Sequence, residues 1–299
     1  MRFVTYQRAA LAALLLFTFG AVANAKDKEA VFRETETKDV FGFTEGSGIG
    51  LQGEKAFEVG TEANFGKRDG RYWASETKFE YEFTPSQYVQ FEFGPFVSYH
   101  NINGVTGRDD RNELGFGGLF GEVRYLLLGR GPSSPLSITL SAEPEWKRIS
   151  GGSGDHVTVA ELELKVNADL ELIENRLYAA VNLLYEPEAT HDPDDIGAGW
   201  EMESTGGVSA ALSYRITPSV FLGAEAWYLR HYEGAWLNAF EGDAVYVGPT
   251  LFMKLGHAMS LAAAWNAQIY GREVDNPGVG LNLSEFSRHR AKVSFEVEF

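Results

Sequence analysis

The sequence predicts an all-β protein, a single antiparallel transmembrane β-barrel of twelve strands. Apolar and polar residues alternate with period two through twelve segments, most of which reach about 10 residues and exceed the ~5–6 typical of soluble sheets. Short and long connections alternate between these segments, and the last segment ends the chain on Phe299. A strand that crosses a bilayer at a steep tilt needs ~9–11 residues, so segment length favours a membrane barrel.

Residues 1–25 have the composition of a secretory signal peptide. Two arginines, an apolar run and the small residues Ala23-Asn24-Ala25 follow one another before Lys26. This pattern predicts cleavage near Ala25-Lys26, and the apolar run is too short for a permanent membrane helix of about 20 residues. The chain contains no cysteine, so after export its stability would depend on its core and on closure of its sheet rather than on disulfides.

Residues 26–53 form a polar segment ahead of the barrel, which we assign to residues 54–299. The segment is interpreted as a periplasmic N-terminal tail or as a plug that folds into the lumen, and the sequence leaves both alternatives open. Residues 48–53 spell G-x-G-x-x-G. A dinucleotide site needs a strand before this motif and a helix after it, whereas here a charged segment precedes it and a strand follows, which favours a flexible turn.

The clearest alternation runs from Ala160 to Glu171, where Leu162 and Leu164 share one face and Glu161 and Glu163 share the other. The same criterion predicts strands near 54–68, 71–84, 88–100, 114–128, 136–148, 157–172, 177–188, 204–217, 220–231, 244–255, 259–270 and 289–299. Short connections are expected at 84–87, 129–135, 173–176, 217–219 and 256–258, and long ones near 101–113, 149–156, 189–203, 232–243 and 271–288. Both termini then lie at the end of the barrel that carries the short turns.

The final strand carries Phe295, Val297 and Phe299 on one face. This strand resembles the signal by which bacterial outer-membrane barrels are recognised for assembly. The resemblance implies an integral barrel of the Gram-negative cell outer membrane, with outer-membrane lipids, lipopolysaccharide and the barrel-assembly machinery as partners. Aromatic residues near both ends of the strands, such as Trp73 and Tyr125, agree with two membrane interfaces. A secreted soluble β-sandwich would also alternate, but it needs neither such long strands nor a terminal phenylalanine.

Side-chain parity directs the charged face of each strand into the lumen. The candidate lumen and vestibule residues are Glu122, Arg124, Glu143, Glu145, Lys147, Glu161, Glu163, Lys165, Glu186, Glu188 and Glu225. The formal net charge is −16, which excludes nucleic acid as a partner because such proteins need a basic surface. Acids outnumber bases in the lumen, so pairing cannot use them all, and an unpaired buried charge is costly. Apolar lumen candidates are Phe96, Phe116, Phe120, Trp227 and Phe252, which we interpret as space-filling.

Two Glu-Pro-Glu motifs, Glu143-Pro144-Glu145 and Glu186-Pro187-Glu188, place their prolines on the lipid-facing parity. Pro95 and Pro249 share that parity. Because proline has no N–H to donate to a neighbouring strand, we expect bulges there or levels at which strands leave regular pairing. The glutamates would then form an acidic outer vestibule rather than a catalytic pair.

These observations predict a passive channel with a water-filled, acidic, cation-preferring lumen that passes small solutes or ions. A closed structural or surface-binding barrel is the main alternative. A lipid-modifying hydrolase is a weaker one, because it needs Ser and His in mutual reach and no motif connects His100 or His231 to Ser98 or Ser204. No enzymatic activity, cofactor or metal site is predicted.

Overall fold

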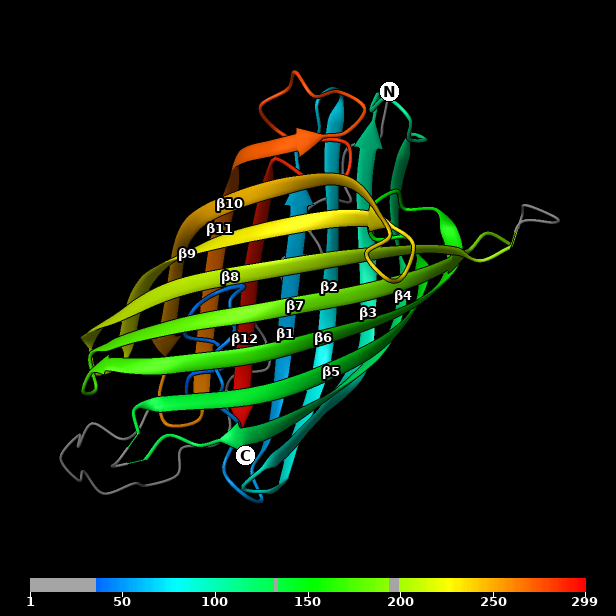
Figure 1. Ribbon diagram of the computed structural model, residues 1–299. Helices are drawn as coiled ribbons and strands as arrows, with labels where there is room; N and C mark the ends of the chain where they lie inside the picture. The colour runs from blue at the N-terminus through cyan, green and yellow to red at the C-terminus, as the bar shows by residue number, and fades with distance from the viewer. Residues whose placement is uncertain (1–35, 132–133, 194–198) are drawn as a thin grey trace, which may run out of the picture. The chain divides into compact units, whose positions relative to one another are not determined.

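The alternating segments form twelve antiparallel strands in a computed structural model that describes residues 36–131, 134–193 and 199–299 (Figure 1). The strands are β1 (Lys55–Phe65), β2 (Arg71–Ser86), β3 (Val89–Asn103), β4 (Arg111–Leu128), β5 (Leu136–Ile149), β6 (His156–Ile173), β7 (Leu177–His191), β8 (Glu201–Thr217), β9 (Val220–Glu233), β10 (Ala239–Lys254), β11 (Met259–Glu273) and β12 (His289–Glu298). The predicted signal peptide, its cleavage site near Ala25-Lys26 and residues 26–35 lie outside the described residues. Among the residues that are described, no helix is long and apolar enough to span a membrane.

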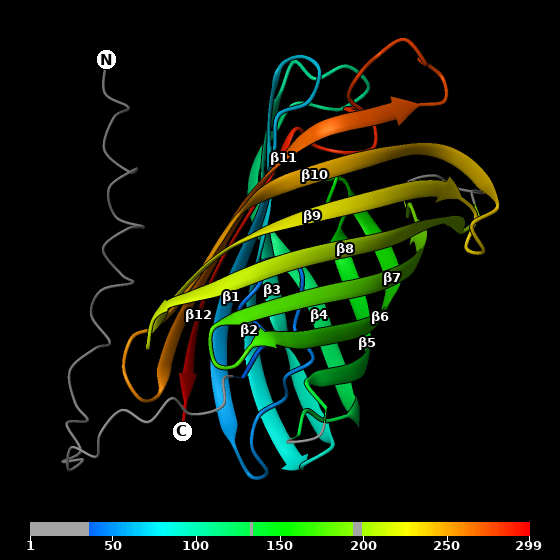
Figure 2. The same ribbon diagram turned by 60° about the vertical axis from the view of Figure 1, so that its left-hand side comes forward.

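Each strand pairs with its neighbours in sequence, and β12 returns to pair with β1. This last ladder runs from Ala56 opposite Glu298 to Phe65 opposite His289. In Figures 1 and 2 strands β6 to β9 cross obliquely in front of β1 to β3 and β12, because all the strands tilt about the barrel axis. The predicted twelve-stranded antiparallel barrel is therefore confirmed, and no strand edge is left unpaired.

The strands extend further than predicted at the end of the barrel that carries the long connections, which we call the loop end. The sequence places a loop at 232–243, whereas β9 ends at Glu233 and β10 begins at Ala239. Strand β7 likewise continues to His191. At this height both faces of the strands carry polar residues, so the alternation that marks a strand in the sequence fades before the strand itself ends.

The outer wall is apolar and the inner wall is polar, the reverse of a soluble protein. Phe57 and Phe91 are exposed on the outside, while their neighbours Glu58 and Glu92 are buried inside. One aromatic prediction is wrong, because Phe116 is 47% exposed instead of facing the lumen. The β3–β4 register shifts between Phe96 and Val97, which leaves one extra residue in β4. The residues of β4 that precede it therefore face the opposite way from the one that strict alternation predicts. Phe96, Phe120, Trp227 and Phe252 are buried in the interior.

Residues 36–50 lie inside the barrel, where they pack on its more apolar half, and residues 51–53 are exposed. Val40 and Phe41 join a buried cluster with Tyr178, Phe221 and Phe252 of strands β7, β9 and β10. Phe43 joins a second cluster formed by Trp227, Leu229, Ala244, Tyr246 and Ala264. The opposite half of the wall carries charged side chains and is left facing open space.

Each of the four strand prolines interrupts one ladder without changing its register. Strands β6 and β7 pair at Glu161–Glu188 and again at Leu164–Tyr185. The positions between these pairs, which include Pro187, are unpaired, and the register is the same on both sides of them. The same interruption occurs beside Pro95, Pro144 and Pro249. The prolines therefore mark levels where regular pairing stops, as one alternative predicted. The other alternative, a bulge, is met beside Pro95, where the β3–β4 register shifts between Phe96 and Val97. Each missing proline N–H leaves a facing carbonyl without its ladder partner.

The glycines that precede two of these prolines are predicted to be needed for folding. A Cβ on Gly94 would lie 1.8 Å from the Phe79 carbonyl oxygen, and one on Gly248 would lie 1.8 Å from that of Trp265. Gly94→Val and Gly248→Val should each lower barrel stability by more than the ~1–3 kcal/mol of ordinary overpacking, because backbone must move. The folded fraction is measured by the heat-dependent shift of folded barrels on SDS gels. Gly131→Ala is the control, since nothing lies within 4 Å of its Cβ position. Equal folded fractions would contradict the prediction.

Candidate functional site: an acidic chamber inside the barrel

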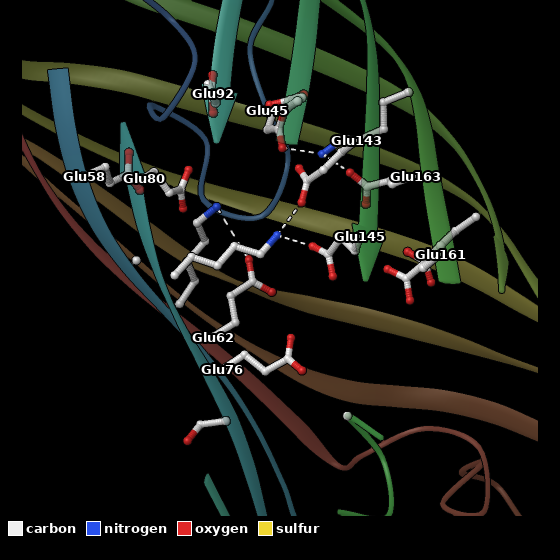
Figure 3. Close-up of a pocket in the computed structure, with 18 of the residues that line it drawn as sticks. Glu45, Glu58, Glu62, Glu76, Glu80, Glu92, Glu143, Glu145, Glu161 and Glu163 are labelled. Carbon is white, nitrogen blue, oxygen red and sulfur yellow. Dashed lines mark hydrogen bonds and ion pairs between the residues drawn. The ribbon is translucent and has the colours of Figure 1, made fainter. Parts of the chain in front are cut away.

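A chamber of about 340 Å³ lies between residues 38–45 and the charged half of the barrel wall (Figure 3). Thirteen of its lining residues are Asp or Glu and six are Lys or Arg. Most of the acids come from strands β1 to β7, where the alternation of the sequence directs them inward. Three charged residues, Lys38, Asp39 and Glu45, come from the N-terminal segment. The chamber is polar and far larger than the ~10–15 Å³ that one water needs, so it has the room and the polar groups to hold water.

The N-terminal segment forms one side of the chamber and is fastened by charge. Arg124 and Lys165 both donate to the Glu45 carboxylate, and Arg124 also donates to the Gly46 carbonyl over 2.9 Å. Lys38 reaches Glu82 at 3.0 Å and Glu92 at 2.8 Å. Arg124 and Lys165, which the sequence places in the lumen, are thus neutralised by a residue of the segment and not by the wall alone.

Glu225 holds the turn of the same segment. Its carboxylate accepts hydrogen bonds from the backbone N–H of Phe43 at 3.1 Å and of Thr44 at 2.7 Å. It also accepts from the Thr44 hydroxyl at 2.8 Å, Trp227 Nε1 at 3.1 Å and Asn266 Nδ2 at 3.0 Å. Sequence parity places Glu225 in the lumen, but its role as an anchor depends on residues 43 and 44, which no pattern in the sequence connects to it.

Asp169 fastens the two ends of the segment in the same way. It accepts from the Thr37 hydroxyl at 2.6 Å and from the Ser47 backbone N–H and hydroxyl, each at 2.7 Å. The residues between Thr37 and Ser47 therefore form a loop that enters the barrel and returns. Both ends of this loop lie near Asp169, close to the short turn between β6 and β7, at the end of the barrel opposite the loop end.

The first Glu-Pro-Glu motif takes part in a chain of ion pairs across strands. Lys78 lies between Glu143 and Glu145 and is 2.5 Å from Glu145. Lys147 lies 3.1 Å from Glu145 and 2.9 Å from Glu161. Lys165 pairs with Glu163 at 2.6 Å. The predicted residues Glu122, Glu143, Glu145, Lys147, Glu161, Glu163, Lys165 and Glu186 all line the chamber. Arg124 and Glu225 lie behind it as anchors of the segment.

The two glutamates of the second Glu-Pro-Glu motif have different surroundings. Glu186 lines the chamber, whereas Glu188 does not and accepts a hydrogen bond from Thr190 at 2.9 Å. Of the four glutamates predicted to form one acidic vestibule, three therefore line the chamber and Glu188 does not. Glu188 lies two residues nearer the loop end along β7, opposite Glu161 of β6.

Several chamber carboxylates lack a basic partner. Glu58, Glu76, Glu80 and Glu186 have no Lys, Arg or His nitrogen within 4.0 Å in the described part of the chain, while Glu62 has Lys292 at 3.6 Å. One oxygen each of Glu58 and Glu76 is buried without a hydrogen-bond partner. Glu58, Glu62 and Glu80 share the inward parity of the predicted residues, so alternation could have found them. Lys38, Asp39 and Glu45 carry no such signal.

A second cavity of about 290 Å³ adjoins the chamber and extends towards the loop end. Glu45, Glu163, Lys165 and Glu186 line both spaces. Near the loops, the second cavity is lined by Tyr72, Gly152 and residues 285–287. The loop of residues 274–288 thus bends over the mouth of the barrel, and Lys67 holds it by donating to the carbonyls of Ser284, Glu285 and Phe286.

The residues considered for a hydrolase do not assemble into a nucleophile and base. His100 Nε2 lies 3.1 Å from the Gly151 carbonyl, and the Ser98 hydroxyl has no hydrogen-bond partner. The Ser204 hydroxyl donates to the Gly234 carbonyl at 2.7 Å. His231 lies among three carboxylates instead of beside a serine. The geometry therefore gives no serine that a histidine could activate among these four residues.

Residues 33–299 match a protein family described as "Family of unknown function (DUF6662)". The chain belongs to this family. No curated protein matches the sequence. Among solved structures, this DUF6662 protein is similar to the COG4313 outer membrane channel from Pseudomonas putida F1, with a TM-score of 0.56, 10% sequence identity, and coverage of 89% of this chain and 100% of that one.

A second similar structure is the translocator domain of the autotransporter NalP from Neisseria meningitidis. The TM-score is 0.51 at 12% identity, covering 84% of this chain and 90% of that one. At such identities the likeness concerns the fold. The DUF6662 chain therefore has the fold of outer-membrane β-barrels, in agreement with the resemblance of its final strand, in which Phe295, Val297 and Phe299 close the chain beside β1.

Removing the Glu225 carboxylate should release the N-terminal segment from the interior. The chain has no cysteine, so Val40→Cys, at a position buried against Phe41 and its cluster, gives a single thiol for labelling. Adding Glu225→Ala should raise its labelling rate at least about tenfold, which corresponds to ~1.4 kcal/mol, because two backbone N–H groups lose a charged acceptor. Glu225→Gln should give a smaller increase, and Glu174→Gln, in an exposed turn, should give none. An unchanged rate in Glu225→Ala would show that this carboxylate is not the anchor.

Proposed function

We propose that this protein is a passive channel of the bacterial outer membrane whose lumen prefers cations. The observation that carries the proposal is the excess of carboxylates, thirteen acids to six bases, around the chamber. The apolar outer wall suits outer-membrane lipids and lipopolysaccharide, and the final strand suits the barrel-assembly machinery. Small ions or solutes would be the transported species.

The distribution of ion pairs supports the preference for cations. Glu45 occupies Arg124 and Lys165, and Lys78 and Lys147 are each shared between two glutamates. These four bases are therefore engaged, while Glu58, Glu80 and Glu186 face the space without a basic partner within 4.0 Å in the described part of the chain. Carboxylates in a narrow cavity with low-dielectric walls raise the local concentration of cations and exclude anions.

The similar structure from Pseudomonas putida is described as an outer membrane channel. That description supports a channel as a function this fold can serve. It says nothing of selectivity, for which the chamber is the basis. The N-terminal segment favours one other candidate, a barrel that stays closed, because it occupies the interior beside the chamber.

The selectivity proposal predicts the effect of neutralising unpaired carboxylates. In planar bilayers under a salt gradient, the reversal potential of the wild-type protein should indicate cation preference. The triple variant Glu58→Gln, Glu80→Gln, Glu186→Gln should reduce the cation-to-anion permeability ratio several-fold, because three uncompensated charges are removed from the path. Glu174→Gln is the matched control, since it is a glutamate in an exposed turn away from the chamber. An anion-selective wild type, or a triple variant identical to it, would refute the proposal.

Deleting residues 36–50 distinguishes the channel from a closed barrel. Conductance should rise, because the segment that fills the apolar half of the interior is gone. Cation preference should fall at the same time, because Arg124 and Lys165 lose Glu45 and keep only Glu122 and Glu163 of the wall as carboxylate partners. Heat-dependent migration on SDS gels confirms that the deleted barrel is folded. A folded barrel that conducts no ions with or without the segment would favour the closed alternative.

A further inference from the structure

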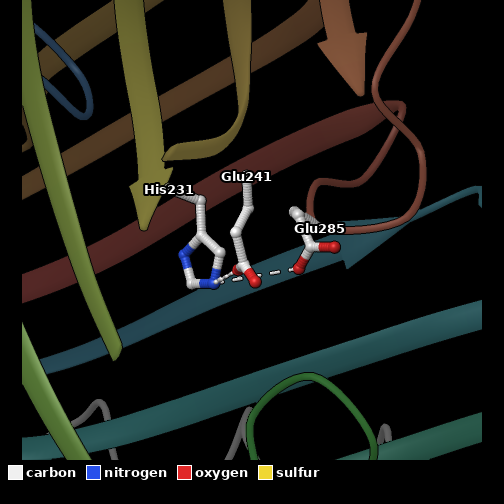
Figure 4. Close-up of side chains that lie close together, drawn as sticks. All are labelled: His231, Glu241 and Glu285. Carbon is white, nitrogen blue, oxygen red and sulfur yellow. Dashed lines mark ion pairs between the residues drawn. The ribbon is translucent and has the colours of Figure 1, made fainter. Parts of the chain in front are cut away.

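Three carboxylates converge on one imidazole nitrogen at the loop end of the barrel. His231 Nε2, in β9, lies 3.3 Å from Glu241 Oε2 of β10, 3.5 Å from Glu203 Oε2 of β8 and 3.8 Å from Glu285 Oε2 of the loop 274–288. Figure 4 shows His231, Glu241 and Glu285 pointing towards one another. Residues from three strands and a loop, spread over more than eighty positions of the sequence, thus direct their ligand atoms at one point.

Charge within the cluster does not balance. Even a protonated His231 offers a single positive charge to three carboxylates, and its Nε2–H can serve only one of them well. No Lys or Arg nitrogen lies within 4.0 Å of Glu203, Glu241 or Glu285 in the described part of the chain. Carboxylates brought together without compensation repel one another, so a cation of higher charge would complete the arrangement.

The spacing of the atoms matches a coordination shell better than a set of hydrogen bonds. Charge-assisted hydrogen bonds are about 2.7–2.9 Å long, shorter than all three distances to Nε2. Ligands bound to one ion at about 2.0–2.2 Å lie roughly 3–3.5 Å apart from one another. The ligand atoms of His231, Glu241 and Glu285 all lie within 4.8 Å of each other, so small side-chain adjustments would close them on an ion.

We propose that His231, Glu203, Glu241 and Glu285 form a binding site for a divalent transition metal, with Zn²⁺ as the representative ion. One imidazole nitrogen with carboxylate oxygens is a donor set that Zn²⁺ accepts, whereas Ca²⁺ and Mg²⁺ take oxygen ligands. The Thr205 hydroxyl lies 3.5 Å from His231 Nδ1, on the side of the ring away from the carboxylates. Phe286 packs edge-on against the imidazole with ring centroids 6.5 Å apart, which restricts its orientation.

The site connects the loop 274–288 to the barrel wall. Glu285 is the loop's ligand, while the other three ligands belong to paired strands. Glu285, Phe286 and Thr205 also line the second cavity, so a bound ion would fasten the loop beside the mouth of the barrel. Metal binding would then order this loop, independently of whether the barrel conducts ions.

Calorimetric titration of ZnCl₂ into the chelator-treated, detergent-purified protein tests the proposal. The wild-type chain should bind one Zn²⁺ with micromolar or tighter affinity. His231→Gln and Glu285→Gln should each weaken binding at least tenfold, and Glu285→Gln changes only an exposed loop residue, so its folding is not in question. Glu233→Gln, an exposed glutamate two positions from His231, is the control and should bind as the wild type does.

Two further measurements separate a metal site from a salt-bridged cluster. Co²⁺ should give a visible absorption band in the wild type that is lost in His231→Gln. A spin label at Asn276→Cys should become less mobile when Zn²⁺ is added to the otherwise wild-type chain. The proposal is overturned if no Zn²⁺ binds, if Zn²⁺ binds equally to His231→Gln, or if only Ca²⁺ or Mg²⁺ binds. Loss of channel activity in an unrelated variant would leave this result unaffected.

Discussion

Pairing between the first and last strands is the constraint on which the rest of this structure depends. In a bilayer an unpaired backbone N–H or C=O has no water to bond to, so a membrane sheet must close. The ladder between β1 and β12 provides that closure, and Phe299 continues it by donating its backbone N–H to the Lys55 carbonyl over 2.8 Å. Closure also creates an interior. Because successive side chains of a strand point to opposite faces, the polar side chains of the strands then face into it.

The interior must then accommodate more acids than bases. Both the barrel wall and the N-terminal segment contribute to this. On the apolar half, Val40, Phe41 and Phe43 fill space against aromatic side chains of the wall. On the charged half, Glu45 compensates Arg124 and Lys165, and several other carboxylates face the open chamber. A segment outside the strands therefore sets both the free volume and the charge of the lumen.

Much of this fold could be predicted because alternation is a local property. Glu161 and Glu163 alternate with Leu162 and Leu164, and a sheet face follows directly from that order. Prediction failed where the local rule was interrupted. An extra residue in β4 directs Phe116 outward. Polar residues on both faces of β7 and β10 near the loop end removed the alternation by which those parts of the strands would have been recognised. Glu188 shares the parity of Glu186 but lies outside the chamber, two residues nearer the loop end of β7.

The sequence by itself determined the number of strands, their antiparallel order and, away from the bulge in β4, the side chains that face inward, because each depends only on residues close together in the chain. The tertiary structure alone decided which charges meet. Glu225 accepts hydrogen bonds from the backbone of Phe43 and Thr44, and Glu45 pairs with Arg124. His231 lies near three carboxylates from separate elements. Those meetings depend on the stagger between strands and on the paths of the inner segment and the loops, which period-two alternation does not encode.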